Sequence, residues 1–225
     1  MPHTFDQNIV DKYISLMEND PHHRYWSWDF CYQEFSDVGN RSKQSMSLAM
    51  YLASWGMYRG SGGLLQKNYR IHEQAVDIIN DSKFKTLICS ERQEVNSGVI
   101  PVILDIRNAL GSYYSSLTFT KNGAAKNISD TDTLTTKIIL GTKGCVPAYD
   151  RYFIGGLKES KMNKCGFGKE GLEEVFLFIE KNESGVKRAQ RLAKKKTNNH
   201  YPIMKIIDMY FWQLGYDSER KKKML

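Results

Sequence analysis

Apolar residues recur every three or four positions along nearly the whole chain, and this spacing constrains the fold more than any other feature. An α-helix places such positions on one face, because one turn holds about 3.6 residues. The spacing occurs in residues 9–17, 71–80, 99–117, 133–140, 171–182, 186–196 and 201–215. The sequence therefore predicts an all-α fold, a single compact multi-helix domain covering residues 1–225.

Two apolar segments need closer reading. Residues 45–58 are apolar on most faces, which is typical of a helix at the centre of a core. Residues 99–117 open with Val and Ile, as strands often do, but Pro101 suits the first turn of a helix and the later apolar spacing is helical. We predict a helix there and leave residues 85–95 unassigned.

Polar residues suggest where several helices begin and end. Ser27 is a candidate N-cap for a second helix. Residues 121–130 are predicted to form a polar loop, with Asp130 or Thr131 capping the helix that follows and Gly141 ending it.

Composition restricts the class of protein. The chain has 225 residues, of which 41% are hydrophobic and 25% charged, a balance typical of globular domains. No segment approaches the roughly 18 apolar residues that span a bilayer, and residues 1–13 do not resemble a secretion signal. The four cysteines are scattered without metal-ligand spacing. We expect a soluble cytoplasmic protein with reduced thiols, no metal and no cofactor.

Positive charge is concentrated in the last third of the sequence. The net charge is +7, and residues 151–225 alone carry +8, because their 17 Lys and Arg outnumber 9 Asp and Glu, whereas residues 1–150 carry −1. Such concentration favours a polyanionic partner, above all DNA, although a solvated lysine-rich face that binds nothing is the alternative. The basic helix 186–196 supplies the main candidate contacts: Lys187, Arg188, Arg191, Lys194, Lys195 and Lys196. Residues 218–225 are predicted to form a frayed basic tail.

Common catalytic motifs are missing from the sequence. There is no G-x-S-x-G, Walker loop, H-E-x-x-H or kinase set. The glycine cluster 59–63 lacks the Lys-Ser/Thr of a phosphate loop and is interpreted as a turn, with Arg59 beside it as a phosphate contact. The histidines stand alone or as the adjacent pair His22 and His23, so no zinc site is expected.

The most informative segment is Val146-Pro147-Ala148-Tyr149-Asp150, which precedes a predicted helix. A carboxylate at a helix N-terminus is stabilised by free backbone N–H groups. By residue type alone, Asp150 is an N-cap, a role that contributes about 1 kcal/mol.

This segment resembles the second half of the helix-hairpin-helix DNA glycosylase superfamily of base-excision repair, the endonuclease-three and oxoguanine-glycosylase type. In that family a Val-Pro-Val-Asp-like loop ends in a catalytic aspartate, which Asp150 would match. Residues 48–66 are similar to the family's central helix and the turn after it, so that the likeness extends over residues 45–215. The resemblance implies that Asp150 is catalytic and that a base is flipped out of the helix.

Three departures limit what the resemblance implies. The Leu-Pro-Gly-Val-Gly hairpin is absent, and the acidic residues 129–133 that replace it would repel phosphate. The lysine nucleophile of bifunctional members would fall on Thr131 or Asp132, and the iron–sulfur cysteines are missing. A monofunctional glycosylase-like enzyme or a degenerate, non-catalytic relative fits better than a lyase.

Other side chains near these turns complete the predicted site. Lys143 and Arg151 are candidate phosphate contacts. The aromatic candidates for base stacking, which core packing would equally explain, are Trp55, Tyr58, Tyr149 and Tyr152. We predict a nucleic-acid-binding helical protein, and the alternatives are a non-catalytic DNA-binding domain or a protein-interaction domain with a basic face.

Overall fold

The computed structural model describes residues 4–36, 39–59, 63–90 and 94–224. Helices dominate these residues, which confirms the all-α prediction in its general form. The α-helices are α1 (Gln7–Glu18), α2 (Trp26–Glu34), α3 (Arg41–Ser54), α4 (Glu73–Asn80), α5 (Ile100–Ser116), α6 (Asp132–Thr142), α7 (Arg151–Glu159), α8 (Lys169–Lys181), α9 (Glu183–Thr197) and α10 (Ile203–Met224). Short 3₁₀ turns are η1 (Leu64–Gln66), η2 (Tyr69–His72), η3 (Ser82–Leu87) and η4 (Ser97–Val99).

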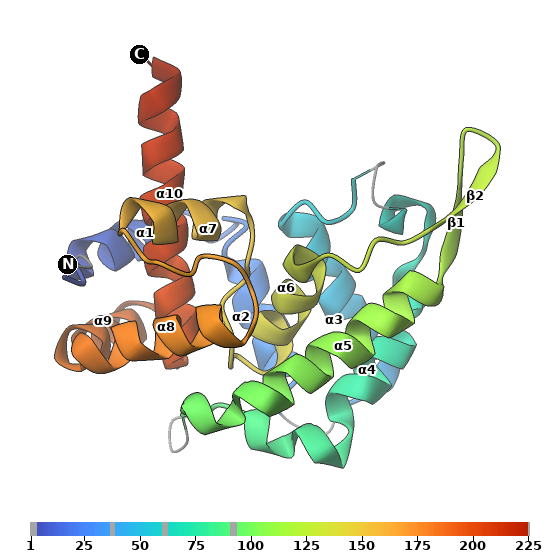
Figure 1. The fold of residues 1–225 in the computed structure, drawn as a ribbon, viewed down its shortest axis with the longest axis horizontal. Coiled ribbons are helices and arrows are strands. Elements are labelled where there is room, and N and C mark those ends of the chain that lie inside the picture. Colours follow the sequence, from blue (N-terminus) through green and yellow to red (C-terminus); the bar gives the residue numbers. More distant parts are fainter. Residues whose placement is uncertain (1–3, 37–38, 60–62, 91–93, 225) are drawn as a thin grey trace.

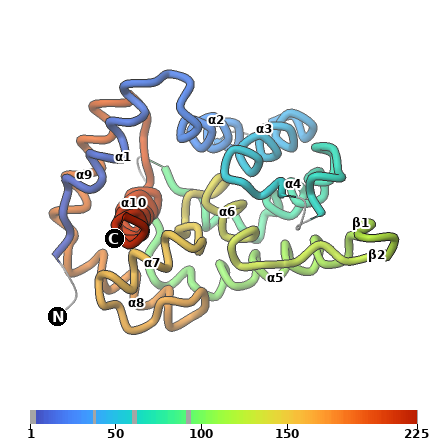
Figure 2. The backbone as a smooth tube through the Cα atoms, turned by 90° about the horizontal axis from the view of Figure 1, so that it is seen from above, coloured from blue at the N-terminus to red at the C-terminus, as the bar shows by residue number. Residues whose placement is uncertain are grey.

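The helices form two groups that meet at α6 (Figures 1 and 2). In one group, α1, α7 and α9 pack around the long helix α10. In the other, α2 and α4 pack on α3, and α5 packs on α4 and α6. Helix α8 connects the groups, since it contacts both α5 and α9.

Helix α6 is the buried centre of the molecule. Every residue from Leu134 to Thr142 is buried, the polar side chains of Thr135, Thr136 and Lys137 included. The sequence predicted that Gly141 ends this helix, but the helix continues to Thr142. A Cβ atom at Gly141 would lie 2.5 Å from the ring of Tyr51, so glycine lets that ring pack on the helix. The chain turns later, at Gly144 (φ 68°).

Helices α7 and α10 cross unusually closely because glycines occupy the contact. A Cβ atom at Gly156 would lie 1.9 Å from the carbonyl oxygen of Phe211, and one at Gly215 would lie 2.0 Å from that of Tyr152. The two backbones therefore touch, which no larger residue permits. This contact fixes the start of α7 against α10.

Several helix ends match the sequence analysis. The first turn of α5 contains Pro101, and Thr131 caps α6 through a hydrogen bond from the Leu134 amide. Ser27 is not a cap, because α2 begins one residue earlier, after Tyr25. Residues 60–62 of the glycine cluster lie outside the described residues.

Residues 121–130 differ from the predicted loop. They contain most of an antiparallel hairpin of β1 (Thr118–Lys121) and β2 (Ala124–Asn127), which projects from the body in Figure 1. Asn122 (φ 53°) and Gly123 (φ 77°) make its two-residue turn, for which positive φ at both positions is required. The predicted basic tail likewise continues α10, which is helical up to Met224.

All four cysteines are free, as expected from their spacing. Cys31, Cys89 and Cys145 are buried, and burial raises the pKa of the Cys31 thiol. Among the described helices, none is both long and apolar enough to span a bilayer.

Candidate functional site

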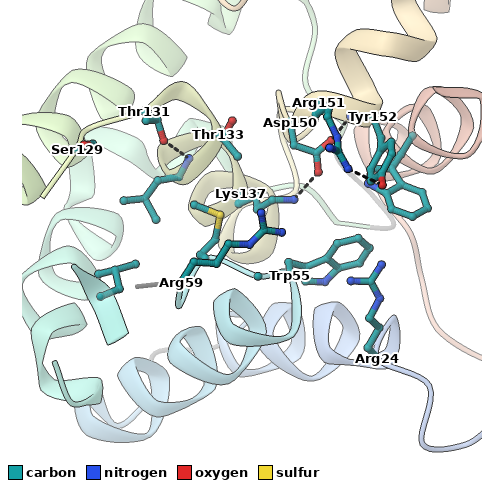
Figure 3. Close-up of a pocket in the computed structure, with 15 residues that line it drawn as sticks. Arg24, Trp55, Arg59, Ser129, Thr131, Thr133, Lys137, Asp150, Arg151 and Tyr152 are labelled. Carbon is teal, nitrogen blue, oxygen red and sulfur yellow. Dashed lines mark hydrogen bonds and ion pairs between the residues drawn. The ribbon is translucent and has the colours of Figure 1, made fainter. Parts of the chain in front are cut away.

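A pocket of about 450 Å³ opens where the end of α3, the first turns of α6, the start of α7 and the middle of α10 come together (Figure 3). Its walls combine aromatic rings, hydroxyl groups, cations and one carboxylate. The lining residues that the following paragraphs use are Arg24, Trp55, Gly56, Arg59, Lys137, Asp150, Arg151, Tyr152 and Trp212.

Asp150 is both the N-cap of α7 and part of this pocket. Its Oδ1 accepts hydrogen bonds from the amides of Tyr152 and Phe153, each at 3.0 Å. The sequence-based cap is therefore confirmed. Its Oδ2 accepts a hydrogen bond from Lys137 Nζ at 2.8 Å, and the Asp150 side chain retains 13% exposure.

The loop that carries Asp150 is held from two helices. The Ala148 amide donates to Asp208 Oδ1 of α10 at 3.0 Å, and the Tyr149 amide donates to Thr136 Oγ1 of α6 at 2.9 Å. The Thr133 hydroxyl donates back to the Tyr149 carbonyl at 3.0 Å. These bonds leave the carboxylate little freedom to move.

Lys137 is a site residue that the sequence analysis missed. It lies 13 positions before Asp150, in the buried α6, and its side chain is only 4% exposed. Its Nζ lies 4.9 Å from the centre of the Trp55 ring. A lysine directly before the apolar residues 138–140 was the available signal, because buried lysines usually have a partner or a function.

The aromatic side of the pocket is rigid. Trp55 stacks on Tyr25 at 5.3 Å with an interplanar angle of 9°, and Tyr25 stacks in turn on Tyr13 at 4.1 Å. The Trp212 ring packs edge-on against Trp55 at 5.6 Å. Trp55 is thus a partly buried residue that packs against the core and also presents a surface to the pocket.

The four aromatic candidates from the sequence separate into two pairs. Trp55 and Tyr152 line the pocket with Asp150. Tyr149 is 1% exposed and packs on Phe153, so its ring belongs to the core. Tyr58 shares a hydrogen bond of 2.8 Å with His72 and does not line the pocket.

Three arginines line the pocket, of which Arg59 and Arg151 were predicted. Arg151 pairs with Glu219 at 3.3 Å and lies over the Tyr152 ring. Arg24, which the sequence analysis did not single out, lies 4.9 Å from the centre of the Trp55 ring. Lys143 is placed differently, since its side chain is buried outside the pocket and burial lowers its pKa.

The basic residues of α9 lie away from Asp150. Helix α9 packs on α1 and α10, and none of its side chains lines the Asp150 pocket. Lys196 pairs with Asp11 at 2.6 Å and Glu18 at 2.9 Å, both in α1. Others of the set flank a separate shallow depression, namely Lys187, Arg188 and Arg191. The basic residues of α9 therefore do not gather at Asp150, because the helix faces another side.

The acidic segment before α6 carries less repulsion than its sequence suggests. Arg107 of α5 lies 2.8 Å from Asp132 and 3.6 Å from Asp130. Both carboxylates therefore have a guanidinium partner, which offsets their charge towards an approaching phosphate.

His72 is a packed histidine, as its isolation in the sequence suggested. Its ring nitrogens share hydrogen bonds with Tyr58 at 2.8 Å and Tyr114 at 2.6 Å, and burial lowers its pKa to about 4. Among the described residues, no three His, Cys, Asp or Glu side chains gather as a metal site.

Comparison of the chain with protein-family models, curated proteins and solved structures gives no match. Its function is therefore inferred from the chemistry of the pocket.

Proposed function

We propose that the protein binds nucleic acid and that the Asp150 pocket accepts one nucleotide extruded from the strand, whose glycosidic bond it cleaves. The observation that supports this most is the joint placement of Asp150, Lys137 and Trp55 in one pocket of about 450 Å³. A volume of that size suits a single nucleoside-sized group.

The wall chemistry supports a flat, partly anionic ligand. The Trp55 indole is held in place by Tyr25 and Trp212. A base can stack on it without the cost of first ordering the indole side chain. The arginines at the mouth offer forked donors that match phosphate oxygens. Protein sites that take a base out of a nucleic-acid strand combine these two features.

The carboxylate supplies the chemical step. As the C1′–N bond breaks, the base leaves with the bonding electron pair and positive charge develops on the sugar. The negative charge of Asp150 stabilises that sugar cation. Water then adds to C1′ and loses a proton, and the departing base takes up a proton through the solvent, so that the products are the free base and an abasic sugar. Lys137 orients the carboxylate through its 2.8 Å hydrogen bond, so that Asp150 is fixed before the substrate enters.

The test measures release of the free base from a set of DNA duplexes. Each duplex contains one deaminated, alkylated or oxidised base. Asp150→Asn keeps a side chain that caps helices well but removes the charge, and we expect base release to fall at least about 100-fold. Asp6→Asn is the matched control, because Asp6 also caps a helix, α1, and does not line the pocket. Release by folded Asp150→Asn at the wild-type rate would contradict the mechanism.

A non-catalytic nucleic-acid-binding protein is the second candidate, and the α9 surface favours it. Lys187, Arg188 and Arg191 gather there independently of the pocket. If Arg188→Gln/Arg191→Gln abolishes DNA binding while no substrate loses a base, this candidate replaces the first. Capture of an acidic protein that survives nuclease treatment, without DNA binding at about 50 mM salt, would instead indicate a protein partner.

A further inference from the structure

Two arginines at the mouth of the pocket, Arg24 and Arg59, have no acidic partner among the described residues. In residues 4–36, 39–59, 63–90 and 94–224, neither Arg24 nor Arg59 forms an ion pair with a carboxylate. Arginines that brace the fold elsewhere do so, for example Arg41, which binds Asp77 at 2.5 Å. The charge of Arg24 and Arg59 is therefore available to a ligand.

Both guanidinium groups lie against the same short turn. The Arg24 guanidinium carbon lies 4.9 Å from the centre of the Trp55 ring. Arg59 Nη2 would lie 2.8 Å from a Cβ atom on Gly56, so the Arg59 side chain folds back onto that glycine. In Figure 3 the Trp55 ring lies between the two guanidinium groups.

The contacts around each guanidinium leave donors unused. Arg24 has one described hydrogen bond to a backbone group, from Nη1 to the Ser54 carbonyl at 3.3 Å, and its plane lies near three aromatic rings. A guanidinium carries five N–H donors. Arg59 is exposed at the opening. Two partly unsatisfied cations beside one aromatic ring suit two phosphate groups that are joined through a sugar bearing a planar base.

We propose that Arg24 and Arg59 bind the phosphates of a single strand on either side of the nucleotide whose base enters the pocket. The ligand class is thus a phosphodiester strand, and a free base or nucleoside lacks the groups that these arginines recognise. This inference rests on the proposed function and adds the polymer backbone to it. Trp55 separates the two phosphate contacts and meets the base.

We call these two phosphate contacts, Arg24 and Arg59, the clamp. Fluorescence anisotropy tests it by measuring how a labelled single-stranded oligonucleotide binds over a range of salt concentrations. Each of Arg24→Gln and Arg59→Gln is expected to weaken binding about tenfold, the loss typical of one charge-assisted hydrogen bond. The double variant is expected to reduce the slope of log affinity against log salt by about 1.4, since each phosphate contact on a single strand contributes about 0.7.

Two controls separate phosphate binding from a packing role. Arg24→Lys keeps the charge, so it is expected to restore most of the salt slope that Arg24→Gln loses. Arg70→Gln removes an arginine that is 71% exposed beside Glu73 and outside the pocket, so affinity and slope are expected to stay at the wild-type values. Thermal unfolding of each variant establishes that it is folded.

The outcomes distinguish the clamp from the function on which it rests. If the wild type binds the oligonucleotide but the double variant keeps its affinity and slope, the clamp is overturned and the pocket function stands. A loss of slope in Arg24→Lys equal to that in Arg24→Gln would also overturn it, because charge would not be the property that matters. If the wild type binds no nucleic acid, the proposed function fails together with the clamp.

Discussion

Lys137 Nζ donates a hydrogen bond of 2.8 Å to Asp150 Oδ2, although 13 positions separate the two residues and each belongs to a different helix. The pair joins α6 to the N-terminus of α7 at the wall of the pocket. Their side chains are 4% and 13% exposed, so each charge depends on the other for compensation.

Removing one member of this pair should destabilise the protein more than removing both. Asp150→Asn leaves the Lys137 charge buried without its partner, and we expect a loss of about 3 kcal/mol in the free energy of unfolding. Lys137→Met/Asp150→Asn removes both charges and should recover at least half of that loss, while base release stays absent. Urea denaturation measures the first effect and substrate assays the second. Equal stability of the single and double variants would show that the pairing is not what stabilises this wall.

The same pairing makes a prediction about covalent chemistry. An amine forms an imine with an aldehyde only when its nitrogen is free to attack, and Lys137 Nζ is nearly buried and bound to Asp150. We expect that borohydride treatment of the protein with an abasic DNA gives no covalent adduct. An adduct that disappears in Lys137→Arg would instead assign Lys137 as a nucleophile and make the enzyme bifunctional.

The crossing of α7 and α10 should not accept one additional methyl group. In Gly156→Ala the new Cβ would overlap the Phe211 carbonyl, 1.9 Å away in the present geometry, so the helices must separate. We expect a loss of about 3 kcal/mol in unfolding free energy. Gly166→Ala serves as the control, because nothing lies within 4 Å of its Cβ position, and should be nearly neutral. Urea titration followed by circular dichroism measures the unfolding free energy of both variants. Similar losses in the two would mean that the close approach of α7 and α10 does not determine stability.

His72 should make stability depend on pH in a defined window. Burial lowers its pKa to about 4 in the folded protein, below the ordinary value of about 6.5 in the unfolded chain. The unfolded state therefore binds more protons between these values, and stability should fall by about 3 kcal/mol as the pH decreases through them. Replacing the ring in His72→Gln should remove this contribution. Denaturation midpoints of the wild type and of His72→Gln at pH 7 and pH 4.5 test this prediction. If stability depends on pH equally in both proteins, the prediction is wrong.

Local sequence signals predicted the elements whose structure depends on local physics. Apolar spacing identified α5 and α8, and residue type placed Asp150 at a helix N-terminus and narrowed the cap of α6 to Asp130 or Thr131, of which Thr131 is the cap. The β1–β2 hairpin was missed because its strands lack an apolar alternation, since Phe119 is the one buried residue of β1 and β2 is exposed throughout. Asn-Gly is nevertheless a strong signal for a two-residue hairpin turn.

Contacts between elements that are far apart in the sequence could not be predicted from local sequence signals. The neighbour of Asp150 comes from the packing of α6, and no spacing rule points to Lys137. The basic face of α9 was identified correctly as a face, but its direction is set by contacts with α1 and α10. Arg24 reaches the pocket because the connection between α1 and α2 passes Trp55, a relationship that only the folded chain contains.

Three residues of the long helix α10 help to fix where the Asp150 carboxylate lies. Asp208 holds the loop at Ala148, Trp212 lines the pocket, and Gly215 receives the backbone of α7. These three residues occur at intervals of four and three, so they share one side of the helix. One residue inserted between Asp208 and Trp212 would rotate the later contacts by about 100°. Trp212 would then no longer face the pocket while Asp208 holds the Ala148 loop. The spacing of these three residues within α10 therefore determines how the Ala148 loop, the pocket wall and α7 are placed relative to one another.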